Sequence, residues 1–208
     1  MLGQVAVPFG IGRPLLTLLL ASLVIMGSPG PSTISATAVG AAFGFRRSLG
    51  YACGLILGTT AVLFAVAIGV VAVVLSIPHC APALAAVSAL YIFYLAFKIA
   101  TAPPLARQRD RIAAPAFAGG FLLAIANPKA YLAIAAVFAG TTIFADDPAL
   151  DALVKTAVLG AMIVIIHLCW LLAGASLSRL LHDPISSRIV NVSLAAILVI
   201  MTAVALIR

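Results

Sequence analysis

The sequence predicts an all-α integral membrane protein, because its composition, its hydropathy and the length of its apolar stretches all agree. Hydrophobic residues make up 64% of the 208 residues and charged residues only 8%, whereas a soluble domain carries about 25% charged residues. The mean hydropathy is +1.27. This length suits about six membrane-crossing helices of ~20 residues each, so we expect one transmembrane translocator domain over residues 1–208.

The apolar stretches, cut at charged residues and prolines, predict the six helices in order. The first follows Arg13, the second stops at Pro78, and the third closes with aromatic residues and Lys98, as an interfacial anchor does. The fifth follows an acidic turn at Asp146 and Asp147. The predicted spans are residues 14–44, 49–77, 82–102, 116–145, 153–178 and 188–207.

A polar linker at residues 103–115 divides the chain into two halves of three spans. An odd number of spans in each half forces the halves to enter the membrane from opposite sides. We therefore predict two inverted three-helix repeats, at about residues 14–102 and about residues 116–207.

Helix-breaking triplets interrupt the first and the fourth predicted spans. The first is Pro29-Gly30-Pro31 and the second is Asn127-Pro128-Lys129. Proline lacks the backbone N–H and clashes with the preceding turn, so each triplet leaves carbonyls unpaired at membrane depth. Such backbone is tolerated only where it is buried in protein or lines a wet cavity. Matching interruptions in two halves are the best sequence indication of a secondary transporter's binding site.

The chemistry of a broken helix suits an amino-acid zwitterion. The second half-helix begins with free N–H groups and a positive dipole end, which attract a carboxylate. The carbonyls freed at the end of the first half-helix can accept hydrogen bonds from an ammonium group. The candidate substrate-binding residues are Pro29, Gly30, Pro31, Ser32, Thr33, Asn127, Pro128 and Lys129.

Two titratable residues within the predicted spans are candidates for coupling. A cation at the centre of a span costs about 2.5–3.5 kcal/mol and usually faces an internal cavity, so Lys129 either binds a carboxylate, acts as a proton-linked switch, or extends to the headgroups. His167, in span five, is either a proton relay or a hydrogen-bonded structural histidine. Asn127 is equally open as a helix cap or a substrate contact.

The distribution of positive charge predicts the orientation. The face formed by the loops after spans one, three and five holds eight Lys and Arg residues, and the opposite face holds Arg13, Lys155 and Arg208. Cytoplasmic loops are enriched in Lys and Arg. We therefore predict a multi-pass protein of the cytoplasmic membrane with both termini extracytoplasmic.

Several motifs together resemble the lysine exporter (LysE/RhtB) family of amino-acid exporters. They are Pro29-Gly30-Pro31-Ser32-Thr33, the run from Gly44 to Gly50, the third-span ending from Ala89 to Lys98, Gly119-Gly120-Phe121-Leu122, and Asn127-Pro128-Lys129-Ala130. The resemblance covers nearly the whole chain and implies efflux of amino acids or similar small metabolites. Family members often carry Asp or Asn directly after Pro-Gly-Pro, and Ser32 at this position disfavours a cationic substrate such as lysine.

Other function classes find little support in the sequence. No H-E-x-x-H, G-x-S-x-G or P-loop motif is present, so we expect no enzyme, no metal or cofactor, and an energy source other than nucleotide hydrolysis. The predicted function is a proton-coupled secondary exporter that works by alternating access. A non-transporting assembly subunit is the alternative, and an intramembrane enzyme is a weaker one. We expect a small-molecule substrate and the lipid bilayer as partners and no nucleic acid, while a homo-oligomer stays open.

Overall fold

The computed structural model describes residues 9–69, 79–101, 114–179 and 184–207, and every regular element in these ranges is helical. The expected all-α class is confirmed. In chain order the elements are α1 (Phe9–Ala21), the π-helical turn η1 (Ser22–Met26), α2 (Pro31–Phe43), α3 (Phe45–Ala67), α5 (Cys80–Ala100), α6 (Phe117–Ala126), α7 (Pro128–Ala139), α8 (Pro148–Arg179) and α9 (Pro184–Ile207).

Four of the predicted spans correspond to helices, or bent pairs of helices, that are long and apolar enough to cross a membrane. Helix α3 and residues Pro148–Leu177 of α8 do so without a break. The pairs α1–η1/α2 and α6/α7 bend by 67° and 62° at the two predicted interruptions. Helices α5 and α9 occupy the third and sixth predicted spans, with shorter apolar stretches at Ala89–Ala100 and Arg188–Val204. The inverted six-helix repeat stays a prediction, and residues 70–77 and 103–113 of the predicted elements lie outside the described residues.

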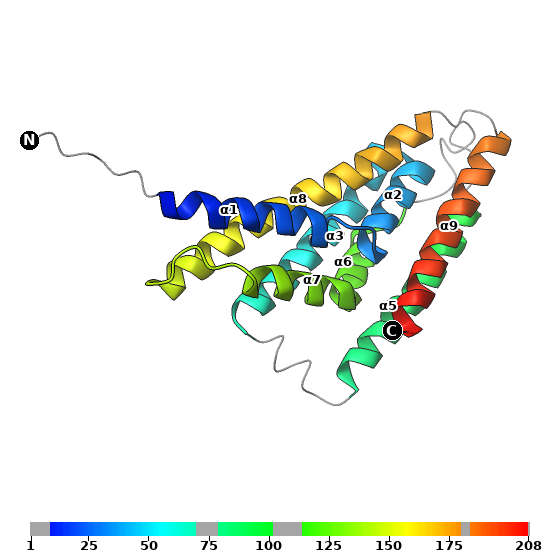
Figure 1. Ribbon diagram of the computed structural model, residues 1–208. Coiled ribbons are helices and arrows are strands. Elements are labelled where there is room, and N and C mark those ends of the chain that lie inside the picture. Colours follow the sequence, from blue (N-terminus) through cyan, green and yellow to red (C-terminus); the bar gives the residue numbers. More distant parts are fainter. Residues whose placement is uncertain (1–8, 70–78, 102–113, 180–183, 208) are drawn as a thin grey trace, which may run out of the picture.

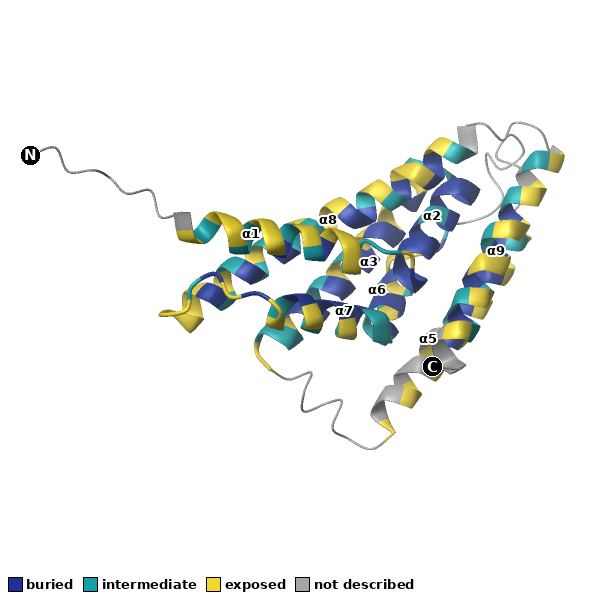
Figure 2. Ribbon diagram, in the orientation of Figure 1, coloured by how far each residue is buried: buried dark blue, intermediate teal, exposed yellow. Residues whose placement is uncertain are grey.

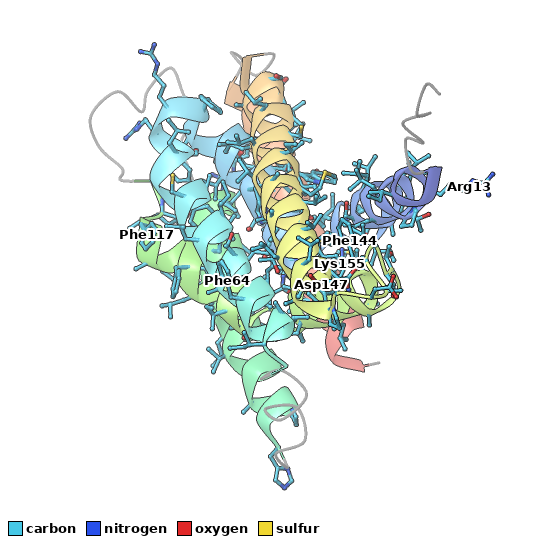
Figure 3. The ribbon with its side chains drawn as sticks, turned by 90° about the vertical axis from the view of Figure 1, so that its left-hand side faces the viewer. Arg13, Phe64, Phe117, Phe144, Asp147 and Lys155 are labelled. Carbon is cyan, nitrogen blue, oxygen red and sulfur yellow. The ribbon has the colours of Figure 1, made fainter. Side chains whose placement is uncertain are left out.

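Large apolar side chains cover the outer surface of the described helices. Leu90 is 72% exposed, Phe97 70% and Phe64 55%; Figure 2 shows exposed residues along the outward sides of the helices, and Figure 3 shows Phe64 and Phe117 at the periphery. Soluble proteins rarely expose large contiguous apolar patches. The surface is therefore suited to lipid, as expected for a multi-pass membrane protein.

Helix α2 lies at the centre of the molecule, with nearly all of its residues buried. It packs along α8, α6 packs along α3, and α5 packs against α9 on the far side of the molecule from α1 (Figure 1). A Cβ atom at Gly174 would overlap the backbone of Thr37, and one at Gly54 would overlap the backbone of Phe117. Glycine therefore allows close backbone contact in both the α2–α8 and α3–α6 pairs.

The ends of α2 and α8 and the start of α9 lie together at one end of the molecule (Figure 1). Helix α3 begins there with Arg46 and Arg47, which are exposed. These arginines belong to the face that the sequence predicts to be cytoplasmic. Which side of the membrane this end faces remains a prediction.

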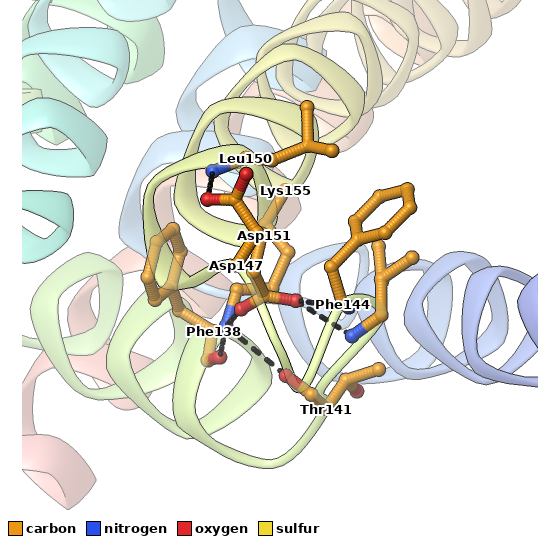
Figure 4. A network of polar contacts seen from close by, with 8 residues as sticks. Phe138, Thr141, Phe144, Asp147, Leu150, Asp151 and Lys155 are labelled. Carbon is orange, nitrogen blue, oxygen red and sulfur yellow. Dashed lines mark hydrogen bonds and ion pairs between the residues drawn. The ribbon is translucent and has the colours of Figure 1, made fainter.

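A polar network joins the end of α7 to the start of α8 (Figure 4). One oxygen of Asp151 accepts hydrogen bonds from the backbone N–H groups of Ile143, at 2.6 Å, and Phe144, at 3.1 Å. Its other oxygen lies 2.7 Å from Nζ of Lys155, which also donates to the carbonyls of Phe138, at 2.9 Å, and Thr141, at 3.1 Å. Lys155 is therefore buried rather than a simple surface charge, and the network fixes the connection between α7 and α8.

Candidate functional site

The second helix break is a single residue wide and is completed by its own side chain. Asn127 has extended backbone angles between α6 and α7, and its side-chain Oδ1 accepts from the N–H of Lys129 at 3.1 Å. Pro128 occupies the first turn of α7. A backbone N–H at this position has no partner within the helix, so proline, which lacks the N–H, costs no hydrogen bond there. The sequence left open whether Asn127 caps the break or contacts substrate, and the structure shows that it caps α7.

The first helix break is longer than the sequence predicted. The α-helix gives way to a π-helical turn at Ser22, where the N–H of Gly27 donates to the carbonyl of Ser22 at 3.1 Å. Such turns are frequent at functional sites. After this turn residues 27–30 are non-helical and α2 begins at Pro31, so Pro31 starts the second half-helix instead of lying within the break. At this start the hydroxyl of Thr33 accepts from the N–H of Gly30 at 2.9 Å.

The two breaks meet in space and are joined by side chains of the second. The Nδ2 of Asn127 donates to the hydroxyl of Ser32 at 2.9 Å. The Nζ of Lys129 donates to the carbonyl of Ser28 at 2.6 Å, to its hydroxyl at 2.7 Å, and to the carbonyl of Pro29 at 2.9 Å. An ammonium group has three donors, so Lys129 is fully occupied by the first break and does not extend to the headgroups.

A third helix completes the first break. The indole N–H of Trp170, on α8, donates to the carbonyl of Gly27 at 3.0 Å. Together with Lys129, it pairs the carbonyls of Gly27, Ser28 and Pro29, which the sequence expected to be free for a substrate. Gly30 is required here for space, because a Cβ atom would lie 2.6 Å from Cδ of Lys129 and 2.8 Å from its Nζ.

A cavity of about 40 Å³ lies where the two breaks meet. Of the predicted site residues, those that line it are Gly30, Ser32, Thr33, Asn127, Lys129 and His167; Pro29, Pro31 and Pro128 do not line it. Among the described residues of the lining none is acidic. The space has room for a few water molecules, so an amino acid requires the surrounding helices to separate.

Two buried polar atoms of the cavity lining have no hydrogen-bond partner: Oγ1 of Thr59, on α3, and Nε2 of His167, on α8. Each residue is 5% exposed. The other ring nitrogen of His167, Nδ1, lies 2.8 Å from the carbonyl of Ile163. A carbonyl only accepts, so Nδ1 carries the proton and, in the neutral ring, Nε2 is an acceptor.

The sequence analysis did not single out Thr59, and no spacing rule distinguishes it from its neighbour Thr60. It also missed Ser28, Met26 and Trp170. Ser28 directly precedes the predicted triplet, and Trp170 lies about one turn from His167. These positions are visible in the sequence, but only the packing of α8 against α2 brings Trp170 to Gly27.

Comparison with known proteins matches residues 23–208 to the family model of the LysE type translocator. The chain belongs to this family. The match includes both helix breaks, α3 and α8, and so contains every residue of the cavity.

The translocator is also similar to curated efflux proteins. It is 32% identical over 181 residues to the cysteine/O-acetylserine efflux protein of Escherichia coli (strain K12), covering 86% of this chain and 90% of that protein. The proteins of the same name from Salmonella typhi and Salmonella typhimurium are 32% identical over 180 residues, with the same coverage. No solved structure matches the chain.

Proposed function

We propose that this translocator exports amino acids, or related small zwitterionic metabolites, across the cytoplasmic membrane by secondary active transport. The observation that carries the proposal is the meeting of two broken helices around a small cavity lined by polar groups. The similar proteins named for cysteine and O-acetylserine efflux support the same class of substrate.

The cavity favours a small substrate with an uncharged side chain. No described residue of its lining is acidic, so a cationic side chain would enter without a counter-charge, at a high desolvation cost. The N-terminal turns of α2 and α7 both border the cavity and present positive dipole ends. They supply a site for the substrate's carboxylate.

We propose that transport occurs by alternating access, because the cavity as it stands is too small for an amino acid. An amino acid needs more space than a few waters, while Lys129 and Asn127 hold the two breaks together. Substrate entry therefore requires these contacts to loosen on one side of the membrane, and release requires loosening on the other. Rigid movement of one bundle against another around a fixed site is the usual solution in broken-helix transporters.

Proton coupling is the energy source that the chain's chemistry supports. The sequence has no P-loop, and the cavity contains Lys129 and His167, both of which can change charge. A proton bound from the outside and released to the cytoplasm would drive the opposite movement of the amino acid.

Efflux from proteoliposomes tests the proposed function. Vesicles containing the purified protein are loaded with O-acetyl-L-serine, L-cysteine, L-serine or L-lysine, and loss of each is followed with and without an imposed proton gradient. We expect efflux of at least one of the three neutral amino acids, faster with the gradient, and no efflux of lysine. Absence of efflux of all four at verified insertion would favour the assembly-subunit alternative.

A further inference from the structure

Closure of the first break places the Lys129 cation and the Trp170 indole N–H on the carbonyls that the substrate's ammonium group was expected to bind. The carbonyls of Ser28 and Pro29 are bound by Lys129, and that of Gly27 by Trp170. An ammonium group buried without acceptors is strongly disfavoured. If the cavity binds a zwitterion, acceptors elsewhere in its lining suit the ammonium group better than carbonyls that lie next to the Lys129 cation.

Thr59 and His167 provide those acceptors. Both residues line the cavity, and their Oγ1 and Nε2 atoms are buried and lack hydrogen-bond partners. A buried acceptor without a partner is unfavourable, so a donor that arrives and bonds to it stabilises the complex. The bond from Nδ1 to the carbonyl of Ile163 holds the ring in the tautomer whose Nε2 accepts.

We propose that Thr59 Oγ1 and His167 Nε2 bind the ammonium group of the exported amino acid, and that a proton on Nε2 competes with it for the same lone pair. This inference rests on the proposed function and assigns its proton coupling to a single atom, Nε2 of His167. Protonated His167 would have two donors and no acceptor, and its positive charge would repel the ammonium group. Proton and substrate therefore occupy the site in turn, as exchange of one for the other requires.

The other charged groups around His167 are few. Helices α1, α2 and α3 and the turn η1 pack against α8, and none of their described residues that line the cavity is charged. From α7, Lys129 faces the cavity, with its Nζ on three oxygens of the first break. Its positive charge adds to the repulsion of an ammonium group once His167 is protonated.

Two isomeric probes test the inference directly. O-acetyl-L-serine and N-acetyl-L-serine have the same atoms, but only the first has a free ammonium group. Binding to the purified protein in lipid nanodiscs is followed by the fluorescence of Trp170, the only tryptophan of the chain, and by calorimetric titration. We expect O-acetyl-L-serine to bind about tenfold to a hundredfold more tightly than its isomer, the range for a hydrogen bond to a charged group.

Matched variants at Thr59 and His167 distinguish loss of a hydrogen bond to the substrate from loss of the fold. Thr59→Val removes the hydroxyl at constant shape, while Thr59→Ser keeps it. His167→Asn can retain a donor to the carbonyl of Ile163 but lacks an acceptor at the position of Nε2, whereas His167→Gln can place an amide oxygen near that position and does not titrate. We expect Val and Asn to weaken O-acetyl-L-serine binding about tenfold or more and to lose discrimination between the isomers, while Ser and Gln retain both.

The dependence on pH gives the second readout. In the wild type, direct competition weakens binding of O-acetyl-L-serine by up to about tenfold per pH unit as His167 becomes protonated, whereas His167→Gln should bind equally at about pH 7 and about pH 5. Equal affinity for the two isomers, or wild-type binding in both Thr59→Val and His167→Asn, would overturn the inference while leaving amino-acid export intact. A wild-type protein that binds neither probe and exports no amino acid would overturn both.

Discussion

The two helix breaks differ in where their hydrogen-bond partners come from. At the second break, Asn127 caps the half-helix that follows it and needs no distant group to do so. At the first break, the carbonyls of Gly27, Ser28 and Pro29 are paired by Trp170 and Lys129, which lie 100 to 143 residues further along the chain. A break whose cap comes from its own side chain can keep its hydrogen bonds while neighbouring helices move. A break whose hydrogen-bond donors lie on other helices loses those bonds when the helices separate. The first break is therefore the one that we expect to rearrange during transport.

Removing the amine of Lys129 should reduce efflux most, because this amine pairs the carbonyls of Ser28 and Pro29 at the first break. Lys129→Met keeps length and apolar packing but leaves the oxygens of Ser28 and Pro29 without donors, and each bond to a charged group contributes about 1.5–3 kcal/mol. We expect efflux from preloaded cells, normalised to inserted protein, to fall to background. Lys129→Arg should restore only part of it, because guanidinium is planar and stays protonated. Wild-type efflux in the Met variant would eliminate Lys129 from the mechanism.

Adding a methyl group at Gly30, beside the Lys129 side chain, should reduce efflux less than removing the amine does. In Gly30→Ala the new Cβ atom would occupy space within 3 Å of the Lys129 side chain, so we expect the lysine to lose part of its bonding and efflux to fall about tenfold. Gly160→Ala, in α8, is the matched control, because no atom lies within 4 Å of the added group. Equal efflux in the two variants at equal expression would show that the Gly30–Lys129 contact is not needed.

Substitution of Asn127, at the second break, should mainly lower the thermal stability of the protein. Asn127→Ala removes the cap of α7 and the bond to Ser32, and loss of a cap costs about 0.5–2 kcal/mol, so thermal denaturation in detergent should occur at a lower temperature. Asn127→Asp keeps an oxygen for the N–H of Lys129 and can accept from the Ser32 hydroxyl, so it should unfold near the wild-type temperature. An equal loss in both variants would argue against capping as the role of this side chain.

Reporter fusions test whether the two halves of the chain enter the membrane from opposite sides, and they do not depend on transport activity. Fusions after residue 150 and at the C-terminus should be extracytoplasmic, and fusions within residues 104–114 cytoplasmic, because of the distribution of Lys and Arg. A cytoplasmic C-terminus would overturn both the six-span count and the inverted repeat.

The sequence predicted what the local chemistry of proline and asparagine determines. Pro31 and Pro128 lack the N–H that a continuing helix needs, so both breaks could be placed to within a few residues. The π-helical turn at Ser22–Met26 has no such signal, because it is a run of mostly apolar residues that would equally suit an α-helix. The first break was therefore predicted too short.

Long-range partners could not be predicted in the same way. The cost of a cation in the membrane favoured an interior position for Lys129 but left extension to the headgroups open. Its binding to Ser28 and Pro29 depends on how the two halves pack. Nothing in the sequence separates Thr59 from Thr60, and its place at the cavity depends on how α3 packs against α8. The spacing of Asp151 and Lys155, by contrast, permits a helical ion pair, although the sequence analysis used Lys155 only to count the charges of one face.

The network at the end of α7 has a mechanical consequence for the whole site. Asp151 and Lys155 fasten the connection between α7 and α8, and glycine-mediated contact fastens α2 to α8 and α6 to α3. The network thus ties α7, which carries Lys129, to α8, which carries His167. We expect a movement of either helix to displace the other, so that the two titratable residues of the cavity lining move together.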